Sequence, residues 1–189
     1  MKLILASQSP RRKELLSQLG VSFETCPADI DETPLASELP EEYVVRMAVE
    51  KAQVISNRFP ESWILGSDTS VILDGVIMGK PENETDALNM LSSLSGKTHQ
   101  VLTAVALVCQ QQVKTRLVST DVVFRDISPE LAKAYWETGE PADKAGSYGI
   151  QGMGGMLVRS IEGSYSSVVG LPLAETADLL MDIGIEGWW

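Results

Sequence analysis

Cysteine and histidine, which often bind metals or act as nucleophiles and bases, are scarce here: the 189 residues include two cysteines and one histidine. Cys26 and Cys109 have neither the spacing of metal ligands nor the density of a disulfide-rich secreted domain. We therefore expect two small buried thiols in a reducing compartment. His99 adjoins a predicted strand without a serine or cysteine nucleophile motif, so a structural role is favoured over a catalytic one.

Positive charge is also scarce, with 15 lysines and arginines against 26 aspartates and glutamates and a net charge of −11. Proteins that bind nucleic-acid polymers normally present broad basic surfaces, so we expect no such partner. A small phosphorylated ligand stays compatible with this charge, because a few local cations can outweigh a distant acidic surface.

Long apolar runs are absent. The longest, such as residues 104–109, fall far short of the roughly 20 residues that a membrane-spanning helix needs. The apolar run near the N-terminus spans only a few residues, and arginines follow it instead of preceding it, unlike a signal peptide. We expect no membrane association and a cytoplasmic location.

The remaining pattern alternates between strands and helices. Strands are predicted at 3–5, 21–26, 63–68, 70–73, 76–78, 101–109, 113–125 and 156–161, and helices begin at Pro10, near Pro40, near Asn83, at Ser128 and at Pro172. Several neighbouring strands are joined by short turns and must be antiparallel, and Asp74-Gly75 between the strands at 70–73 and 76–78 predicts a hairpin with a type I′ turn. The expected architecture is an α/β fold with a mixed sheet, in one domain over residues 1–189 with room for two lobes.

The junction after the apolar run at 3–5 predicts the start of a helix with an unusual charge. Ser9 is a good N-cap, and Pro10 suits the first helical position because its missing N–H would be unpaired there anyway. Arg11 and Arg12 then fall in the first turn, where the helix macrodipole already places about +0.5 charge. Two guanidinium groups are unfavourable there unless something negative lies between them.

A bound polyphosphate would supply that negative charge. The hydroxyls of Ser7 and Ser9, the backbone N–H groups of the helix start and the guanidinium groups of Arg11 and Arg12 together form a strong anion site. The alternative is two solvated surface arginines.

The best candidate for a catalytic carboxylate is Asp68, at the end of the strand predicted over 63–68, because strand ends are rigid and yet open to a crevice. Its alternative role is an Asx-turn or cap. We expect Asp68 to bind a divalent ion and accept a proton from water, with Glu32 as a further metal ligand. Asp29 and Asp31 are interpreted as solvated loop charges.

Two lysines and one glutamine complete the candidate site. Lys51 falls on or beside the buried stripe of its predicted helix, where it either contacts phosphate or extends from the edge of the stripe to solvent. Lys80 is either a phosphate contact or a surface lysine, since GVIMGKP at 75–81 lacks the spacing of a P-loop. Gln151 can read a base edge with its paired donor and acceptor, although its glycine-rich segment is also typical of a mobile loop.

Six blocks of sequence together resemble the Maf family. They are SQSPRR at 7–12, EKA at 50–52, GSDT at 66–69, GKP at 79–81, DKAGSYGIQG at 143–152 and VVGLPL at 168–173. The blocks cover nearly the whole chain in the expected order, so the resemblance is specific. It implies a Maf-like, inosine triphosphatase-like fold, in which helices flank an elongated mixed sheet and two lobes surround a cleft.

The resemblance also implies an activity. Maf-like proteins hydrolyse a nucleoside triphosphate to the monophosphate and pyrophosphate with a divalent cation, here Mg²⁺ or Mn²⁺. We expect water to attack the α-phosphorus. Asp68 is implied as the proton acceptor. The groups implied around the phosphates and metal are Arg11, Arg12, Glu32, Lys51 and Lys80.

The branch of the family that looks most similar prefers dTTP and UTP and carries Arg, Thr and Gln at the positions that select the substrate. Arg12, Thr69 and Gln151 match them, whereas a branch acting on 7-methyl-GTP has Trp, Gln and Glu. Gln151 can pair with the O4 and N3–H edge of uracil or thymine. The resemblance therefore implies a dTTP/UTP pyrophosphatase, with modified pyrimidine nucleotides as further candidate substrates.

Two other functions stay open. One is a nucleotide-binding regulator of cell division that acts through a protein partner, and the other is a pyrophosphatase for non-standard purine nucleotides. Trp188 and Trp189 are assigned only packing or self-association, for example as a homodimer.

Overall fold

The computed structural model describes residues 2–189 and confirms a mixed α/β architecture. The strands are β1 (Leu3–Leu5), β2 (Glu24–Thr25), β3 (Trp63–Leu73), β4 (Val76–Met78), β5 (Thr98–Cys109), β6 (Gln112–Phe124) and β7 (Val158–Glu162). The helices are α1 (Pro10–Gln18), α2 (Pro40–Ser56), α3 (Glu84–Leu94), α4 (Pro129–Glu137), α5 (Tyr165–Val169) and α6 (Leu173–Met181). Three short 3₁₀ helices are η1 (Glu140–Asp143), η2 (Ala145–Ser147) and η3 (Met153–Leu157).

The strands form one sheet in the order β2-β1-β3-β5-β6-β7, and β4 pairs with β3 beside this path. β1 is parallel to β2 and to β3, whereas the β3–β4 and β6–β7 pairs are antiparallel. The predicted Asp74-Gly75 hairpin is confirmed: both residues have positive φ, at 52° and 78°, as a type I′ turn requires.

The backbone contacts divide the chain into two compact units. Unit 1 comprises residues 1–68, 103–118 and 170–189, and unit 2 comprises residues 69–102 and 119–169. The long strands β3, β5 and β6 each contribute one segment to each unit, so one strand can serve two cores. Within residues 2–189, no helix is long and apolar enough to span a membrane.

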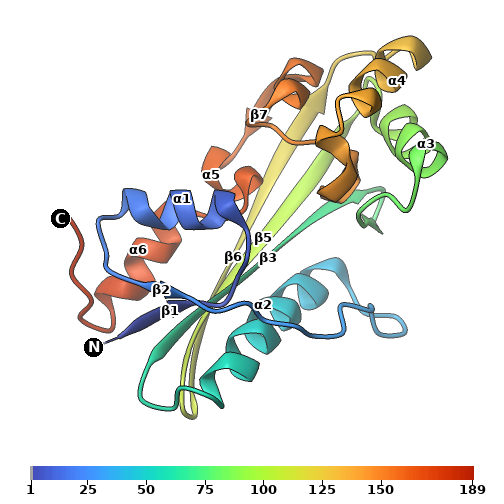
Figure 1. The fold of residues 1–189 in the computed structure, drawn as a ribbon. Helices are drawn as coiled ribbons and strands as arrows, with labels where there is room; N and C mark the ends of the chain where they lie inside the picture. Colours follow the sequence, from blue (N-terminus) through green and yellow to red (C-terminus); the bar gives the residue numbers. More distant parts are fainter. Residues whose placement is uncertain (1) are drawn as a thin grey trace. The chain divides into compact units, whose positions relative to one another are not determined.

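In unit 1, the sheet lies between helices on its two faces, with α1 and α6 on one face and α2 on the other (Figure 1). Ile4, Ile64 and Val108 from three strands pack with Ala52 and Ile55 of α2 in a buried cluster. This packing of α2 against the strands therefore positions the start of α1, which follows β1, and the middle of β3.

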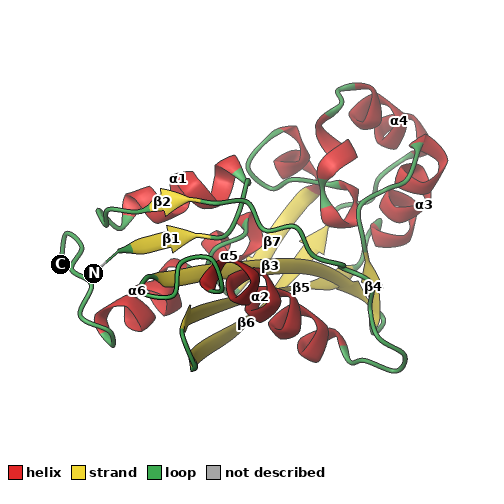
Figure 2. Cartoon of the chain, turned by 60° about the horizontal axis from the view of Figure 1, so that its bottom comes forward, coloured by secondary structure: helices red, strands yellow, loops and turns green. Residues whose placement is uncertain are grey.

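In unit 2, α3 and α4 lie side by side (Figure 2). Leu91 and Leu94 of α3 are fully buried with Phe124, Tyr135 and Tyr148. The predicted helix start at Asn83 is confirmed, because its side chain accepts a hydrogen bond from the Asp86 N–H at 3.0 Å.

Several predicted boundaries are wrong. The strands predicted at 63–68 and 70–73 form one strand that continues to Leu73, because among residues 69–72 only Thr69 is half-buried and Ser70, Val71 and Ile72 are buried. Asp68 therefore lies in the middle of a strand and not at its end.

Other local predictions are also corrected. The strand predicted at 21–26 is reduced to Glu24–Thr25. The glycine-rich loop contains η2 and η3, so the strand expected at 156–161 starts only at Val158. Cys26 and Cys109 form no disulfide, as expected, but both are only half-buried, and Cys26 packs at the margin of the buried cluster of unit 1.

His99 lies in the aromatic core of unit 2, 2% exposed. Its Nε2 is 2.8 Å from the Tyr148 hydroxyl, and its ring meets Phe124 edge-on at 4.8 Å between centroids. Nδ1 is buried with no hydrogen-bond partner among the described residues, so a second ring proton would find no acceptor. Burial lowers the pKa of His99 to about 4.

We expect the His99 ring to titrate near pH 4 and not near 6.5. Between those pH values the unfolded chain binds a proton that the native state does not, so stability should fall as the pH drops from about 6.5 to 4. Because the chain has a single histidine, its imidazole proton signals in an NMR titration need no assignment by mutation. A midpoint at its ordinary value would contradict this burial.

Candidate active site

A close approach between α2 and β3 places the central residues of the site in unit 1. Gly66 of β3 faces the backbone carbonyl of Ala48, and a Cβ added to Gly66 would collide with that oxygen. Glycine is therefore required at this crossing. Lys51 follows Ala48 by about one helical turn and Asp68 lies two strand residues beyond Gly66, so the crossing brings the two side chains together.

Lys51, Asp68 and Glu32 form a three-membered charge cluster. The Lys51 Nζ donates to Asp68 Oδ1 at 2.7 Å and lies 2.6 Å from Glu32 Oε1. Lys51 and Asp68 are 9% and 7% exposed, whereas the Glu32 side chain is 50% exposed. The lysine therefore does not extend to solvent: it bridges the two carboxylates that the sequence suggested as metal ligands.

This donor set suits a hard divalent cation that takes most of its ligands from a substrate. The carboxylates of Glu32 and Asp68 both contact the Lys51 ammonium. Among residues 2–189, no three His, Cys, Asp or Glu side chains gather into a complete metal cluster. Mg²⁺ is typically bound through one or two carboxylates plus substrate phosphates.

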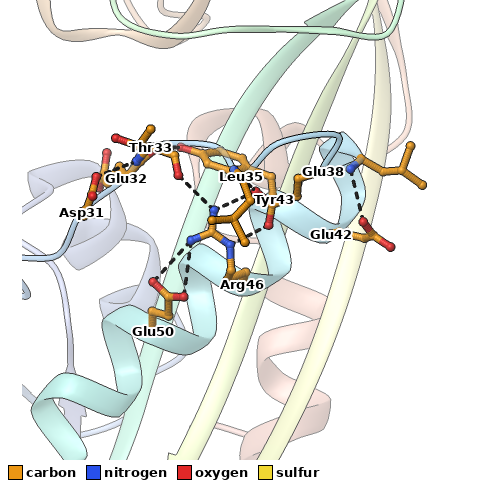
Figure 3. Close-up of polar contacts among 10 residues, drawn as sticks. Asp31, Glu32, Thr33, Leu35, Glu38, Glu42, Tyr43, Arg46 and Glu50 are labelled. Atoms are coloured by element: carbon orange, nitrogen blue, oxygen red, sulfur yellow. Dashed lines mark hydrogen bonds and ion pairs between the residues drawn. The ribbon is translucent and has the colours of Figure 1, made fainter.

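The loop that carries Glu32 is tied to α2 by Tyr43 and Arg46. The Tyr43 hydroxyl donates to the Glu32 carbonyl at 2.8 Å, and Arg46 donates to the Thr33 carbonyl at 3.2 Å. Figure 3 shows Arg46 reaching Glu38 and Glu50 as well; its bonds to Glu38 measure 2.5 and 2.7 Å. Glu32 is thus placed through its backbone, with its carboxylate 2.6 Å from the Lys51 ammonium.

The charges around this loop are strongly paired. The hydrogen bonds from Arg46 lower the pKa of Glu38 to about 2 and raise that of Arg46. Burial, together with the charges of Asp68 and Glu32, raises the pKa of Tyr43 to about 12. Tyr43 therefore stays protonated and remains a hydrogen-bond donor over the whole neutral range.

Replacing Tyr43→Phe should lower the free energy of unfolding by about 1 kcal/mol, because the Glu32 carbonyl loses its donor. It should also speed hydrogen exchange of amides 31–35. Urea unfolding and exchange mass spectrometry measure both effects. Tyr165→Phe is the control, since Tyr165 is 49% exposed. Equal exchange of that loop in both variants would contradict the tether.

The predicted helix start after β1 is confirmed. Ser9 caps α1 by accepting from the Arg12 N–H at 3.4 Å, and Ser7 Oγ accepts from the Ser9 N–H at 3.1 Å. Pro10 occupies the first helical position. Both serine side chains therefore also shape the turn that presents the first N–H groups of α1.

Arg12 is not a solvated surface arginine. It is half-buried, and its Nε donates to the Gly170 carbonyl at 2.8 Å. The Ser67 hydroxyl donates to the same carbonyl at 3.1 Å. Burial lowers the pKa of Arg12, the charges of Asp68 and Glu32 oppose this effect, and Arg11 adds to it. Arg12 therefore lies within the electrostatic reach of the carboxylates and remains a cation.

Unit 2 carries the other predicted residues. Thr69, half-buried, follows Asp68 on β3, and Lys80 is exposed just after β4. The Gly79 carbonyl beside Lys80 accepts from the Gly146 N–H at 3.0 Å. Gln151 is exposed just before η3.

Sequence reasoning missed four residues that hold the unit 1 site: Tyr43, Arg46, Ser67 and Gly170. All four act on or through a backbone carbonyl, which leaves no motif. The VVGLPL block at 168–173 was the only signal for Gly170, and it gave no role. Asp29 and Asp31 are exposed as expected, and Asp31 Oδ1 accepts from the Thr33 N–H at 2.9 Å.

Comparison with known proteins gives a match over almost the full length. The family described as Maf-like protein matches residues 2–183. A dTTP/UTP pyrophosphatase from Colwellia psychrerythraea is 54% identical, over 98% of this chain and 90% of that protein. Proteins with the same name from Pseudoalteromonas atlantica and Shewanella sp. are 55% and 53% identical, over 94% and 98% of this chain and 95% and 100% of their own length.

A solved structure titled as a nucleoside-triphosphatase / dITP/XTP pyrophosphatase from Mycobacterium abscessus is a much more distant match. It overlaps 66% of this chain and 74% of its own at 16% identity, with a TM-score of 0.43.

Proposed function

This chain belongs to the family of Maf-like proteins, and from that premise we propose that it hydrolyses dTTP and UTP to the monophosphate and pyrophosphate. The observation that carries the proposal is full-length identity above 50% to proteins named dTTP/UTP pyrophosphatase. The paired carboxylates and the arginines at the start of α1 support it, since hydrolysis of a triphosphate needs both a base and cations.

In unit 1, we assign Asp68 the role of proton acceptor for the attacking water. Its carboxylate is buried and oriented by Lys51, so it needs no reorganisation during the reaction. Arg11, Arg12, the Ser7 and Ser9 hydroxyls and the N–H groups of the α1 start bind the phosphates and oppose the negative charge that grows on departing pyrophosphate.

Glu32 and Asp68 would hold a divalent cation, Mg²⁺ or Mn²⁺. When bound, the cation would supply charge neutralisation at the phosphates and lower the pKa of water. In the absence of metal, the Lys51 ammonium keeps the two carboxylates together. Their mutual repulsion therefore does not open the site.

In unit 2, we assign Thr69 and Gln151 to base selection, together with Arg12 of unit 1, and Lys80 to a phosphate. Gln151 offers an N–H donor and a carbonyl acceptor, which match O4 and N3–H of uracil or thymine. An exposed glutamine on a glycine-flanked segment can approach a flat ring without steric hindrance.

Release of pyrophosphate tests the function. The purified protein with Mg²⁺ or Mn²⁺ should cleave dTTP and UTP faster than ITP, XTP and GTP. Preference for ITP or XTP would assign it to purine nucleotides instead. Absence of turnover on every nucleotide with either metal would overturn the enzymatic function and favour a regulator acting through a protein partner.

Exchanging Gln151→Glu should reduce the dTTP/GTP selectivity by about tenfold or more, because a carboxylate cannot donate to O4. The ratio of kcat/KM values measures the change. Gln111→Glu is the matched control, since Gln111 lies exposed in the turn between β5 and β6. Unchanged selectivity in Gln151→Glu would remove this residue from base recognition.

We further propose a cytoplasmic location and a homodimer. Trp188 packs on the end of α1, where its Nε1 donates to the Gln18 carbonyl at 2.9 Å, yet it remains 74% exposed. That ring is therefore a candidate self-association contact. Sedimentation of the native chain and of Trp188→Ser tests it, and an unaltered mass would exclude this contact.

A further inference from the structure

Glu140, which no motif singled out, accepts three hydrogen bonds in unit 2. Its Oε2 accepts from the Met153 N–H at 2.8 Å, and its Oε1 accepts from the Gly154 N–H at 2.9 Å and from the Tyr135 hydroxyl at 2.8 Å. A glutamate used only as a surface charge would not turn both oxygens toward a backbone segment.

The segment that Glu140 holds is the one that carries Gln151. We call residues 149–154 the Gln151 loop. Its first residue, Gly149, donates its N–H to the Tyr135 hydroxyl at 3.1 Å, and its last residue donates to Glu140. Tyr135 and Glu140 thus fasten both ends of the loop, with Gln151 between them.

The glycines of the loop allow this attachment. A Cβ on Gly152 would collide with the Glu140 carboxylate, and one on Gly154 would collide with the Tyr135 hydroxyl. The backbone therefore lies directly on the two anchoring side chains. A glycine-rich stretch is typical of a mobile loop, but this one packs directly against the buried Tyr135 and the Glu140 carboxylate.

We propose that Glu140 is a positioning residue that sets substrate selectivity by fixing the backbone on both sides of Gln151. The inference rests on the proposed role of Gln151 in base recognition. Glu140 itself is not a catalytic residue, since it acts through the loop. Its effect should therefore appear in binding of the pyrimidine and not in the chemical step.

The contacts of Glu140 with the Gln151 loop and with Tyr135 require a carboxylate. Burial raises the pKa of Glu140, but the N–H groups of Gly154 and Met153 and the Tyr135 hydroxyl outweigh this effect, so the pKa is lowered. A glutamine at this position keeps the size but accepts through one oxygen only. Its NH₂ group must then face either the Met153 N–H or the donors at Oε1, and two donors repel.

The Glu140→Gln variant tests the proposal, with Glu137→Gln as a matched control, because Glu137 is exposed at the end of α4 and undergoes the same change of charge. Glu140→Gln should raise the KM for dTTP roughly tenfold, change kcat less than twofold and lower the dTTP/GTP selectivity. Glu137→Gln should leave all three quantities unchanged. A merely structural role would reduce the active fraction and hence kcat, with KM and selectivity intact.

A double-mutant cycle tests whether Glu140 affects KM through Gln151. If Glu140 acts through that residue, Glu140→Gln should have little further effect on KM in a Gln151→Ala background. Additive effects would overturn the proposal, as would wild-type KM and selectivity in Glu140→Gln itself.

Two controls keep the result interpretable. Should Glu140→Gln fail to fold, Tyr135→Phe removes the other anchor, and Tyr148→Phe is its control because that hydroxyl contacts His99 instead. Wild-type protein that cleaves no pyrimidine nucleotide would refute the proposed function. If the wild type is active and both Glu140→Gln and Tyr135→Phe keep its selectivity, only the positioning role of Glu140 would be refuted.

Discussion

Asp68→Asn should lower kcat for dTTP by a factor on the order of 10² to 10⁴, the range that loss of a general base produces. The amide cannot take the proton from water, and its NH₂ group cannot ligate a cation as a carboxylate does. KM should change less than kcat, because the arginines and Lys80 that we assign to the phosphates are untouched.

The fold should survive this change. Lys51 keeps Glu32 as its partner at 2.6 Å, so its ammonium is not left unpaired. Steady-state kinetics and a thermal melt of the same sample separate chemistry from folding. Asp74→Asn is the control, because Asp74 is exposed in the type I′ turn, where asparagine before glycine is favourable. Full turnover by Asp68→Asn would remove Asp68 from the mechanism.

Lys51→Met should be the most destabilising single change at the site. The methionine fits the apolar stem of the lysine but leaves the buried Asp68 carboxylate beside Glu32 with no ammonium between them. Removing one partner of a buried ion pair costs about 3 to 5 kcal/mol, and the exposure of Glu32 places the effect near the lower end. The melting temperature should then fall by roughly 6 to 12 °C.

Magnesium gives this variant a distinctive signature. A divalent cation can take the place of the ammonium between the two carboxylates, so Mg²⁺ should raise the melting temperature of Lys51→Met more than that of the wild type. Lys114→Met is the control: Lys114 pairs with Asp182 at the surface, and its loss should cost less than about 1 kcal/mol. Equal melting temperatures in Lys51→Met and Lys114→Met would refute the central role of the Lys51 bridge.

Features governed by neighbouring residues could be predicted from the sequence. The cap at Ser9, the proline after it and the Asp74-Gly75 turn depend on contacts within four residues, and all three are confirmed. The continuity of β3 across residue 69 could not be predicted in this way. Thr69 and Ser70 interrupt the apolar pattern, but the strand continues because Val71 and Ile72 are buried, Val71 in the core of unit 2.

The residues of the site could be proposed singly, but not their contacts. Lys51 was assigned to phosphate and Glu32 to metal, whereas the structure places them 2.6 Å apart. That contact depends on the close crossing of α2 and β3 at Gly66, which is a tertiary property. Glu140 and Tyr43 escaped detection for another reason: they bind backbone groups, and a backbone group has no sequence signature.

The bond from Arg12 to Gly170 joins positions 158 residues apart. During synthesis, the arginine emerges from the ribosome long before its acceptor exists. A nascent chain that ends before Gly170 can form β1 and cap α1, yet its Arg12 has no Gly170 carbonyl to fix the guanidinium. The phosphate site that we assign to Arg12 should therefore reach its final geometry only once translation has passed residue 170.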